Sequence, residues 1–80
     1  MKIAIIGTGY VGLTTAAFLS TIGHQVVCID KDKNKIEQLK QGEIPIYEPG
    51  LEELISNNQQ RLKFTTSIKK IRKCSVVFIT

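Results

Sequence analysis

Three glycines near the start of the chain have the spacing of a phosphate-binding turn. Gly7, Gly9 and Gly12 form the pattern G-x-G-x-x-G directly after a short apolar run. At this spacing the first glycine allows a tight turn, the second lets backbone approach a ligand, and the third lets a helix pack closely. The N–H groups that open such a helix have no partner within it, so those of Tyr10, Val11 and Gly12 are predicted to face the pyrophosphate of a dinucleotide.

An acidic residue stands where a dinucleotide site needs a partner for its ribose. Asp30 follows the apolar run 25–29 and lies 18 residues after Gly12, close to the usual spacing of about 20. Its carboxylate can accept hydrogen bonds from the adenosine ribose hydroxyls and would repel the 2′-phosphate of NADP. The cations Lys31, Lys33 and Lys35 would favour NADP, but with Asp30 present we predict NAD. A surface loop acid is the alternative interpretation of Asp30.

The elements that must position these residues alternate between strand and helix. Apolar runs predict strands over residues 2–6, 25–29, 62–65 and 75–79, and helical patterns cover 10–22, 33–41, 51–57 and 67–72. This order predicts an α/β fold of the Rossmann type, a parallel sheet with flanking helices and right-handed crossovers. The expected strand order is 3-2-1-4, with the glycine turn at the crevice between the first and fourth strands.

Finer patterns predict faces and helix ends. In the helix 10–22, Val11, Phe18 and Ile22 recur at helical steps, while Ala16 and Ala17 are small enough for the helix to lie close to the sheet. These positions therefore predict the apolar face of the first helix.

Two further residues are predicted to begin helices. Asp32 and Ser67 precede helical patterns and have side chains that cap helix N-termini. Ile36 and Leu39 are the expected inner face of the second helix. The loop 43–50, with two prolines, is expected to be a braced connection with Ile46 and Tyr47 packed beneath the next helix.

Composition limits the function classes. The chain has 80 residues, 42% of them apolar and 22% charged, which is ordinary for one small globular domain. No apolar run reaches the length of about 20 residues that spans a membrane, and no signal-peptide pattern opens the chain, so a cytoplasmic protein without membrane contact is expected.

Charge and cysteine content add two expectations. The net charge is +4, and six of the eleven basic residues lie in 61–73. Because that run reads as the polar side of a short helix without interleaved aromatic residues, we do not expect nucleic-acid binding. Cys28 and Cys74 lack a metal-type spacing and are expected to be buried, reduced thiols.

Two segments resemble the UDP-glucose 6-dehydrogenase family. The opening Lys2-Ile-Ala-Ile-Ile-Gly-Thr-Gly-Tyr-Val-Gly12 is similar to the start of these enzymes, and the loop Pro45-Ile-Tyr-Glu-Pro-Gly-Leu51 is the more specific match. The resemblance extends over the chain but covers only the N-terminal part of the family's cofactor domain. The chain departs from the family at two points. Before the last strand it has Cys74-Ser75 in place of the usual alanine-aspartate pair. After the third strand it has Ser67 in place of an aspartate that often caps the helix that follows.

The resemblance implies an activity and a set of cofactor contacts. The family oxidises the 6-hydroxymethyl of a nucleotide sugar to a carboxylate with two NAD, through an aldehyde and a thioester on a cysteine. Its catalytic residues lie far downstream, and neither cysteine here matches the catalytic one, so no catalytic residue is expected in this chain. The implied NAD contacts are Gly7, Gly9, Tyr10, Val11, Gly12, Asp30 and Lys35. Lys35 is alternatively a solvated helix residue.

The predicted function is therefore the NAD-binding part of a UDP-glucose dehydrogenase that makes UDP-glucuronate. Residues 1–80 are expected to be the N-terminal portion of a Rossmann domain in a longer, homo-oligomeric protein that binds its nucleotide-sugar substrate through other domains. The alternatives are a dehydrogenase for UDP-N-acetylmannosamine or GDP-mannose, another NAD-linked hydroxyacid or hydroxyacyl dehydrogenase, and a non-catalytic nucleotide-sensing module.

Overall fold

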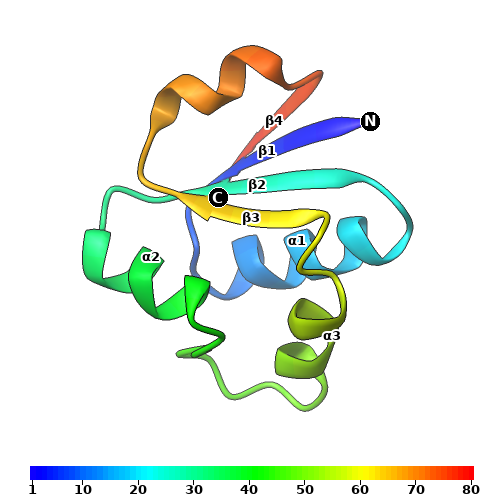
Figure 1. The fold of residues 1–80 in the computed structure, drawn as a ribbon, viewed down its shortest axis with the longest axis vertical. Helices are drawn as coiled ribbons and strands as arrows, with labels where there is room; N and C mark the ends of the chain where they lie inside the picture. Colours follow the sequence, from blue (N-terminus) through cyan, green and yellow to red (C-terminus); the bar gives the residue numbers. More distant parts are fainter.

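A four-stranded parallel sheet organises residues 1–80, all of which the computed structural model describes (Figure 1). The strands are β1 Lys2–Ile6, β2 Gln25–Ile29, β3 Leu62–Thr65 and β4 Val76–Ile79. They lie in the order β3-β2-β1-β4, so the predicted parallel sheet and its strand order are confirmed. Ile6 pairs with Ile29 and with Ile79, so the carboxyl ends of β1, β2 and β4 meet at one edge.

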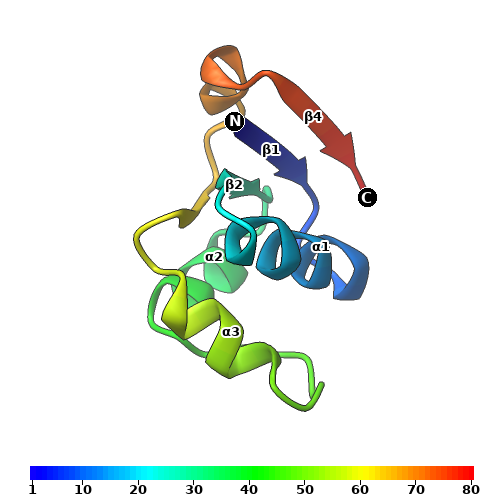
Figure 2. The same cartoon turned by 90° about the vertical axis from the view of Figure 1, so that its right-hand side faces the viewer.

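Three α-helices lie on one side of the sheet, with α3 packed against α1, and a short 3-10 helix crosses the other side (Figures 1 and 2). The helices are α1 Tyr10–Thr21, α2 Lys33–Lys40, α3 Leu51–Asn57 and the 3-10 helix η1 Ile68–Lys73. Right-handed crossovers produce this division, because the chain moves one way from β1 to β3 and the opposite way from β3 to β4. The apolar core lies between the sheet and the three α-helices. None of the helices has the length and apolar character needed to cross a membrane.

The face of α1 that packs on the sheet differs from the predicted one. Phe18 is 61% exposed, and Val11 and Ile22 are exposed as well, whereas Ala16 and Ala17 are buried. The other buried residues of α1 are Gly12, Leu13 and Ser20. The predicted close approach of Ala16 and Ala17 to the sheet is confirmed. The prediction that Val11, Phe18 and Ile22 form the inner face was wrong, because at about 100° per residue these three lie on the side of the helix opposite the buried one.

The second helix follows its prediction closely. The Asp32 carboxylate caps α2 by accepting a hydrogen bond from the Lys35 N–H at 3.1 Å. Ile36 and Leu39 are buried against the core, as expected. The helix ends at Lys40, one residue before the predicted end.

The proline-containing connection to α3 is braced on one side only. Ile44 and Ile46 pack against the core, but Tyr47 is 96% exposed, so the predicted packing of Tyr47 beneath the helix was wrong. The chain bends at Pro45 and Ile46, and Tyr47 follows the bend with its side chain in solvent. Gly50 then adopts a φ of +85° and leads directly into α3.

The crossover to β4 also departs from its prediction. Ser67 does not cap a helix with its side chain, and η1 is a 3-10 helix. The Ser67 N–H instead donates to the Thr65 hydroxyl at 3.1 Å, so a local turn replaces the expected cap. The strand β4 begins at Val76, one residue later than predicted, and Phe78 is exposed on it.

The two cysteines are free thiols in different surroundings. Cys28 is fully buried in β2, and burial raises the pKa of its thiol to about 12. A thiol with that pKa stays protonated and unreactive at neutral pH. Cys74 is only half-buried, so the prediction of a buried thiol was right for Cys28 and wrong for Cys74.

Candidate functional site

The turn between β1 and α1 leaves the start of the helix open. Gly7 adopts a φ of +105°, which favours glycine, and its N–H donates to the Ile29 carbonyl at 2.8 Å. The helix begins at Tyr10, and its N-cap residue, Gly9, has no side chain that could accept a hydrogen bond from the first N–H groups. The first N–H groups of a helix have no partner within it, so the turn presents donors with the positive end of the helix dipole behind them.

Two of the three glycines of the turn are required by the atoms packed around them. A Cβ at Gly12 would lie 2.1 Å from the Gly7 carbonyl oxygen, so only glycine allows this close approach of helix and turn. A Cβ at Gly7 would lie 2.6 Å from the Thr80 hydroxyl oxygen.

Gly9 is different, because nothing in the chain requires a glycine there. Its φ of −78° suits any residue, and a Cβ would meet no atom within 4 Å. Open space at the middle glycine, directly before unpaired N–H groups, fits a ligand whose phosphates approach the backbone. The turn therefore has the shape that a bound dinucleotide needs.

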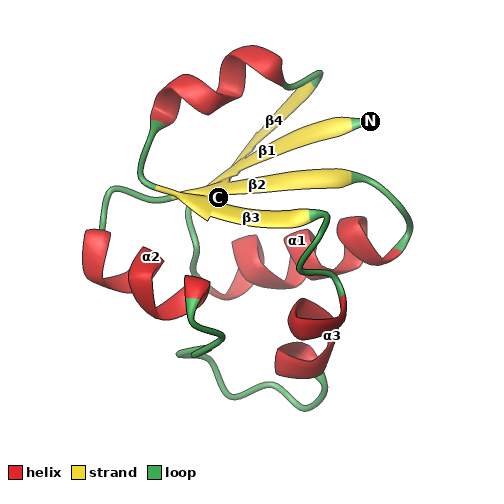
Figure 3. Cartoon of the chain, in the orientation of Figure 1, coloured by secondary structure: helices red, strands yellow, loops and turns green.

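The loops after β1 and β2 leave the same edge of the sheet (Figure 3). Asp30, the first residue after β2, contacts Thr8 of the turn there. Its Oδ2 accepts two hydrogen bonds from Thr8, one from the N–H at 3.1 Å and one from the hydroxyl at 2.7 Å. Its Oδ1 accepts the Asp32 N–H at 3.0 Å. The Thr8 hydroxyl is the main reason that the pKa of Asp30 is lowered, with smaller contributions from the two N–H donors and from the charge of Lys35, and burial opposing. The carboxylate is therefore an ionised acceptor at neutral pH.

Thr8 is the residue of this site that the sequence analysis missed. It is completely buried although it is polar, and it connects the glycine turn to Asp30 across 22 residues of sequence. The x position of G-x-G accepts many residue types, so the motif alone carried no signal for this bond.

The predicted site residues fall into one neighbourhood. Gly7 and Asp30 line a hollow of about 310 Å³ at the carboxyl edge of the sheet, together with residues that follow β2 and β3. Tyr10 and Val11, the first two residues of α1, are exposed. Lys35 lies in the first turn of α2, close enough for its charge to affect Asp30.

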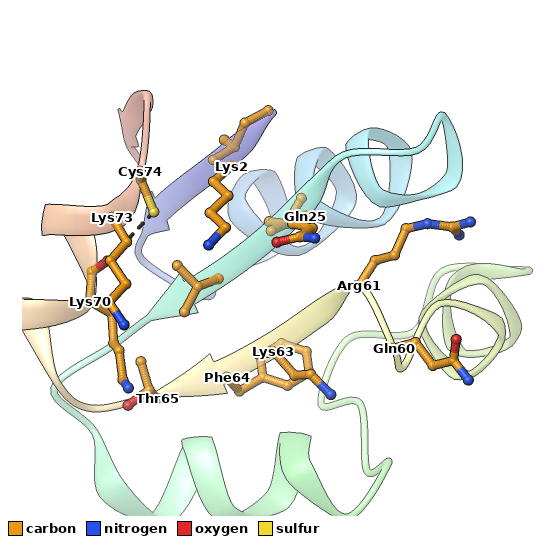
Figure 4. A pocket seen from close by; sticks show the side chains of 13 residues that line it. Lys2, Gln25, Gln60, Arg61, Lys63, Phe64, Thr65, Lys70, Lys73 and Cys74 are labelled. Atoms are coloured by element: carbon orange, nitrogen blue, oxygen red, sulfur yellow. Dashed lines mark hydrogen bonds between the residues drawn. The ribbon is translucent and has the colours of Figure 1, made fainter.

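A larger hollow of about 470 Å³ lies elsewhere, across the sheet face on the η1 side (Figure 4). None of the predicted site residues lines it. Its basic lining residues are Lys2, Arg61, Lys63, Lys70 and Lys73. The Cys74 thiol lies at its rim and donates to the Lys70 carbonyl at 3.6 Å.

Comparison with known proteins identifies the family. Residues 1–80, the whole chain, match the family described as "UDP-glucose/GDP-mannose dehydrogenase family, NAD binding domain". The chain belongs to the UDP-glucose/GDP-mannose dehydrogenase family. The matched part is the family's NAD binding domain, and NAD is therefore the cofactor of this domain, as Asp30 predicted.

Individual relatives agree with this assignment. A UDP-glucose 6-dehydrogenase of Bacillus subtilis is 52% identical over 81 residues, which cover 98% of this chain and 18% of the relative. A UDP-glucose 6-dehydrogenase of Rhizobium meliloti is 50% identical over 82 residues, covering 99% of this chain and 19% of the relative. The crystal structure of a GDP-mannose dehydrogenase from Pseudomonas aeruginosa superimposes with a TM-score of 0.94 at 44% identity, covering 100% of this chain and 19% of that one. The chain thus spans about a fifth of the length of the relatives it matches.

Proposed function

We propose that residues 1–80 form the N-terminal portion of the NAD-binding domain of a nucleotide-sugar dehydrogenase. The full-length enzyme, in this proposal, oxidises UDP-glucose to UDP-glucuronate with two NAD. The observation that carries the cofactor site is the open space at Gly9 beside the uncapped start of α1, with the Asp30 carboxylate at the next strand end. Relatives of about 50% identity that are named UDP-glucose 6-dehydrogenase support the substrate.

Each predicted residue has a defined task in binding. The N–H groups of Tyr10, Val11 and Gly12 hold the pyrophosphate, helped by the dipole of α1. Gly7 and Gly9 shape the turn so that the phosphates can approach the backbone. Bound NAD supplies the hydride acceptor of the reaction.

The adenosine end of the cofactor is held by one charged residue directly after β2 and another in α2. Asp30 accepts a hydrogen bond from the ribose, and the charge of Lys35 helps to keep the carboxylate ionised. The groups that act on the sugar belong to other parts of the full-length protein. Neither Cys28, whose thiol is buried and protonated, nor Cys74 is assigned a catalytic role.

Two related substrates are the alternatives within the family. A GDP-mannose 6-dehydrogenase of Pseudomonas aeruginosa is 47% identical over 72 residues, and a UDP-D-ManNAc dehydrogenase of Pyrococcus horikoshii has a TM-score of 0.95 at 29% identity. The identities favour UDP-glucose. A role in polysaccharide biosynthesis, a cytoplasmic location and a homo-oligomeric assembly stay predictions.

A substrate comparison with the full-length protein tests this proposal. UDP-glucose, GDP-mannose and UDP-N-acetylmannosamine are each supplied with NAD, and NADH formation is followed by absorbance. We expect turnover with UDP-glucose and two NADH for each UDP-glucuronate formed. Turnover with another nucleotide sugar would reassign the substrate. NAD binding without turnover of any nucleotide sugar would instead support a nucleotide-sensing module.

A further inference from the structure

The hydrogen bonds around Asp30 leave little freedom to its carboxylate. Thr8 donates twice to Oδ2, through its N–H at 3.1 Å and its hydroxyl at 2.7 Å. Oδ1 accepts one bond, from the Asp32 N–H at 3.0 Å. An ionised carboxylate has about four acceptor positions, two on each oxygen. Both positions of Oδ2 are therefore filled, and the remaining position is on Oδ1.

The residue that fills Oδ2 is itself held in place. Thr8 is completely buried, and the neighbouring Gly7 N–H donates to the Ile29 carbonyl at 2.8 Å. The pairing of Ile6 with Ile29 fixes the ends of β1 and β2 relative to each other. The contact between Thr8 and Asp30 thus continues the pairing of β1 and β2 beyond the ends of the strands. Rotation of the carboxylate would break the two charge-assisted hydrogen bonds from Thr8.

We propose that Thr8 is a positioning residue for NAD recognition, which holds Asp30 so that Oδ1 receives the adenosine ribose and NADP is excluded. The proposal rests on the proposed function, because it assumes that Asp30 meets the ribose. A carboxylate that is free to turn could move its charge away from a 2′-phosphate, whereas one held by Thr8 keeps the charge where that phosphate would lie. Thr8 itself touches neither the ribose nor the reacting atoms in this scheme.

The test compares Thr8→Val with Thr8→Ser in the full-length protein. Valine keeps the branched shape of threonine but removes the hydroxyl, and serine keeps the hydroxyl. Dissociation constants of NAD and NADP are measured by calorimetric titration. We expect Thr8→Val to weaken NAD binding about tenfold, the effect of one charge-assisted hydrogen bond, without an equal loss for NADP. Thr8→Ser should retain most of the preference for NAD.

A matched control separates positioning from a general loss of stability. The Thr21 hydroxyl also makes a tertiary hydrogen bond, which it accepts from the Asn58 side chain at 3.1 Å, at the far end of α1. Thr21→Val therefore removes a neutral tertiary hydrogen bond away from the turn, together with the bond from the Thr21 hydroxyl to the Ala17 carbonyl. It should lower the temperature of thermal unfolding but leave the ratio of NAD to NADP affinity unchanged.

A double-mutant cycle identifies the route of the effect. If Thr8 acts through Asp30, Thr8→Val should have no further effect on the affinity ratio in an Asp30→Ala background. Two outcomes would overturn the proposal. One is a Thr8→Val variant whose ratio of NAD to NADP affinity equals that of the wild type. The other is a double variant in which the effects of the two substitutions on this ratio are additive. Failure of the wild-type protein to bind either dinucleotide would overturn the proposed function itself, so the two failures are distinguishable.

Discussion

Asp30 combines a fixed position with a charge that the surrounding hydrogen bonds stabilise. Replacing it with alanine removes the ribose acceptor, and we expect NAD binding to weaken by roughly 1–3 kcal/mol, the cost of a ribose hydroxyl left without a partner. The preference over NADP should narrow in the same variant, because the repulsion of a 2′-phosphate is lost. Titration of the full-length variant with both dinucleotides measures the two effects.

The control for this substitution is Asp30→Asn, which keeps the size of the side chain and removes the charge. This variant should have a smaller ratio of NAD to NADP affinity than the wild type, and its apoprotein should stay folded. Unchanged affinities for both dinucleotides in Asp30→Ala would remove Asp30 from the site.

The lowered pKa of Asp30 also predicts how stability depends on pH. Because the folded-state pKa lies below the ordinary value of 3.8, the ionised carboxylate stabilises the folded state at pH values above that figure. This contribution is lost as the pH falls through the folded-state pKa, since protonation breaks the charge-assisted bonds from Thr8. The stability of the wild-type protein relative to Asp30→Asn should thus be constant near neutral pH and shrink below about pH 4. Urea denaturation at a series of pH values checks this, and a difference independent of pH would contradict it.

The packing of α1 on the sheet gives the glycine motif its second function. At Gly12 a methyl group would collide with the Gly7 carbonyl, whereas at Gly9 it would meet open space. We expect Gly12→Ala to destabilise the fold by roughly 1–3 kcal/mol, as overpacking does. Gly9→Ala, the matched change three residues away, should leave stability nearly unchanged. Chemical denaturation of both variants measures the difference, and equal stabilities would show that α1 can move away from the turn.

The domain as a whole should be stabilised by its cofactor, because a ligand that binds only the folded state raises the free energy of unfolding. Saturation with NAD at 100 times its dissociation constant adds about 2.7 kcal/mol. We expect NAD to raise the unfolding temperature of the full-length wild-type protein but not that of Gly9→Val, whose side chain fills the phosphate space. Thermal unfolding with and without NAD provides the measurement. An equal increase in a folded Gly9→Val variant would contradict the assignment of the turn.

Much of the fold was predictable because its signals are local. Apolar runs, helical spacing and the Asp32 cap each depend on a few neighbouring residues, and they predicted the ends of every strand and helix to within one residue. The strand order then followed from the handedness of crossovers. The glycine spacing and Asp30 predicted the NAD domain for the same reason, since both sit at fixed distances from the strand ends.

Other features depended on packing between segments that are distant in sequence. The small size of Ala16 and Ala17 correctly predicted that they lie close to the sheet, but periodicity placed Phe18 on the same face. The packing of α1 on the sheet buries the side with Leu13 and the two alanines and leaves Phe18 exposed. The bond between Thr8 and Asp30 joins two loops 22 residues apart, and only the strand register brings them together. The local sequence thus determined which groups the turn offers to a dinucleotide. The orientation of the Asp30 carboxylate depends on its tertiary contact with Thr8.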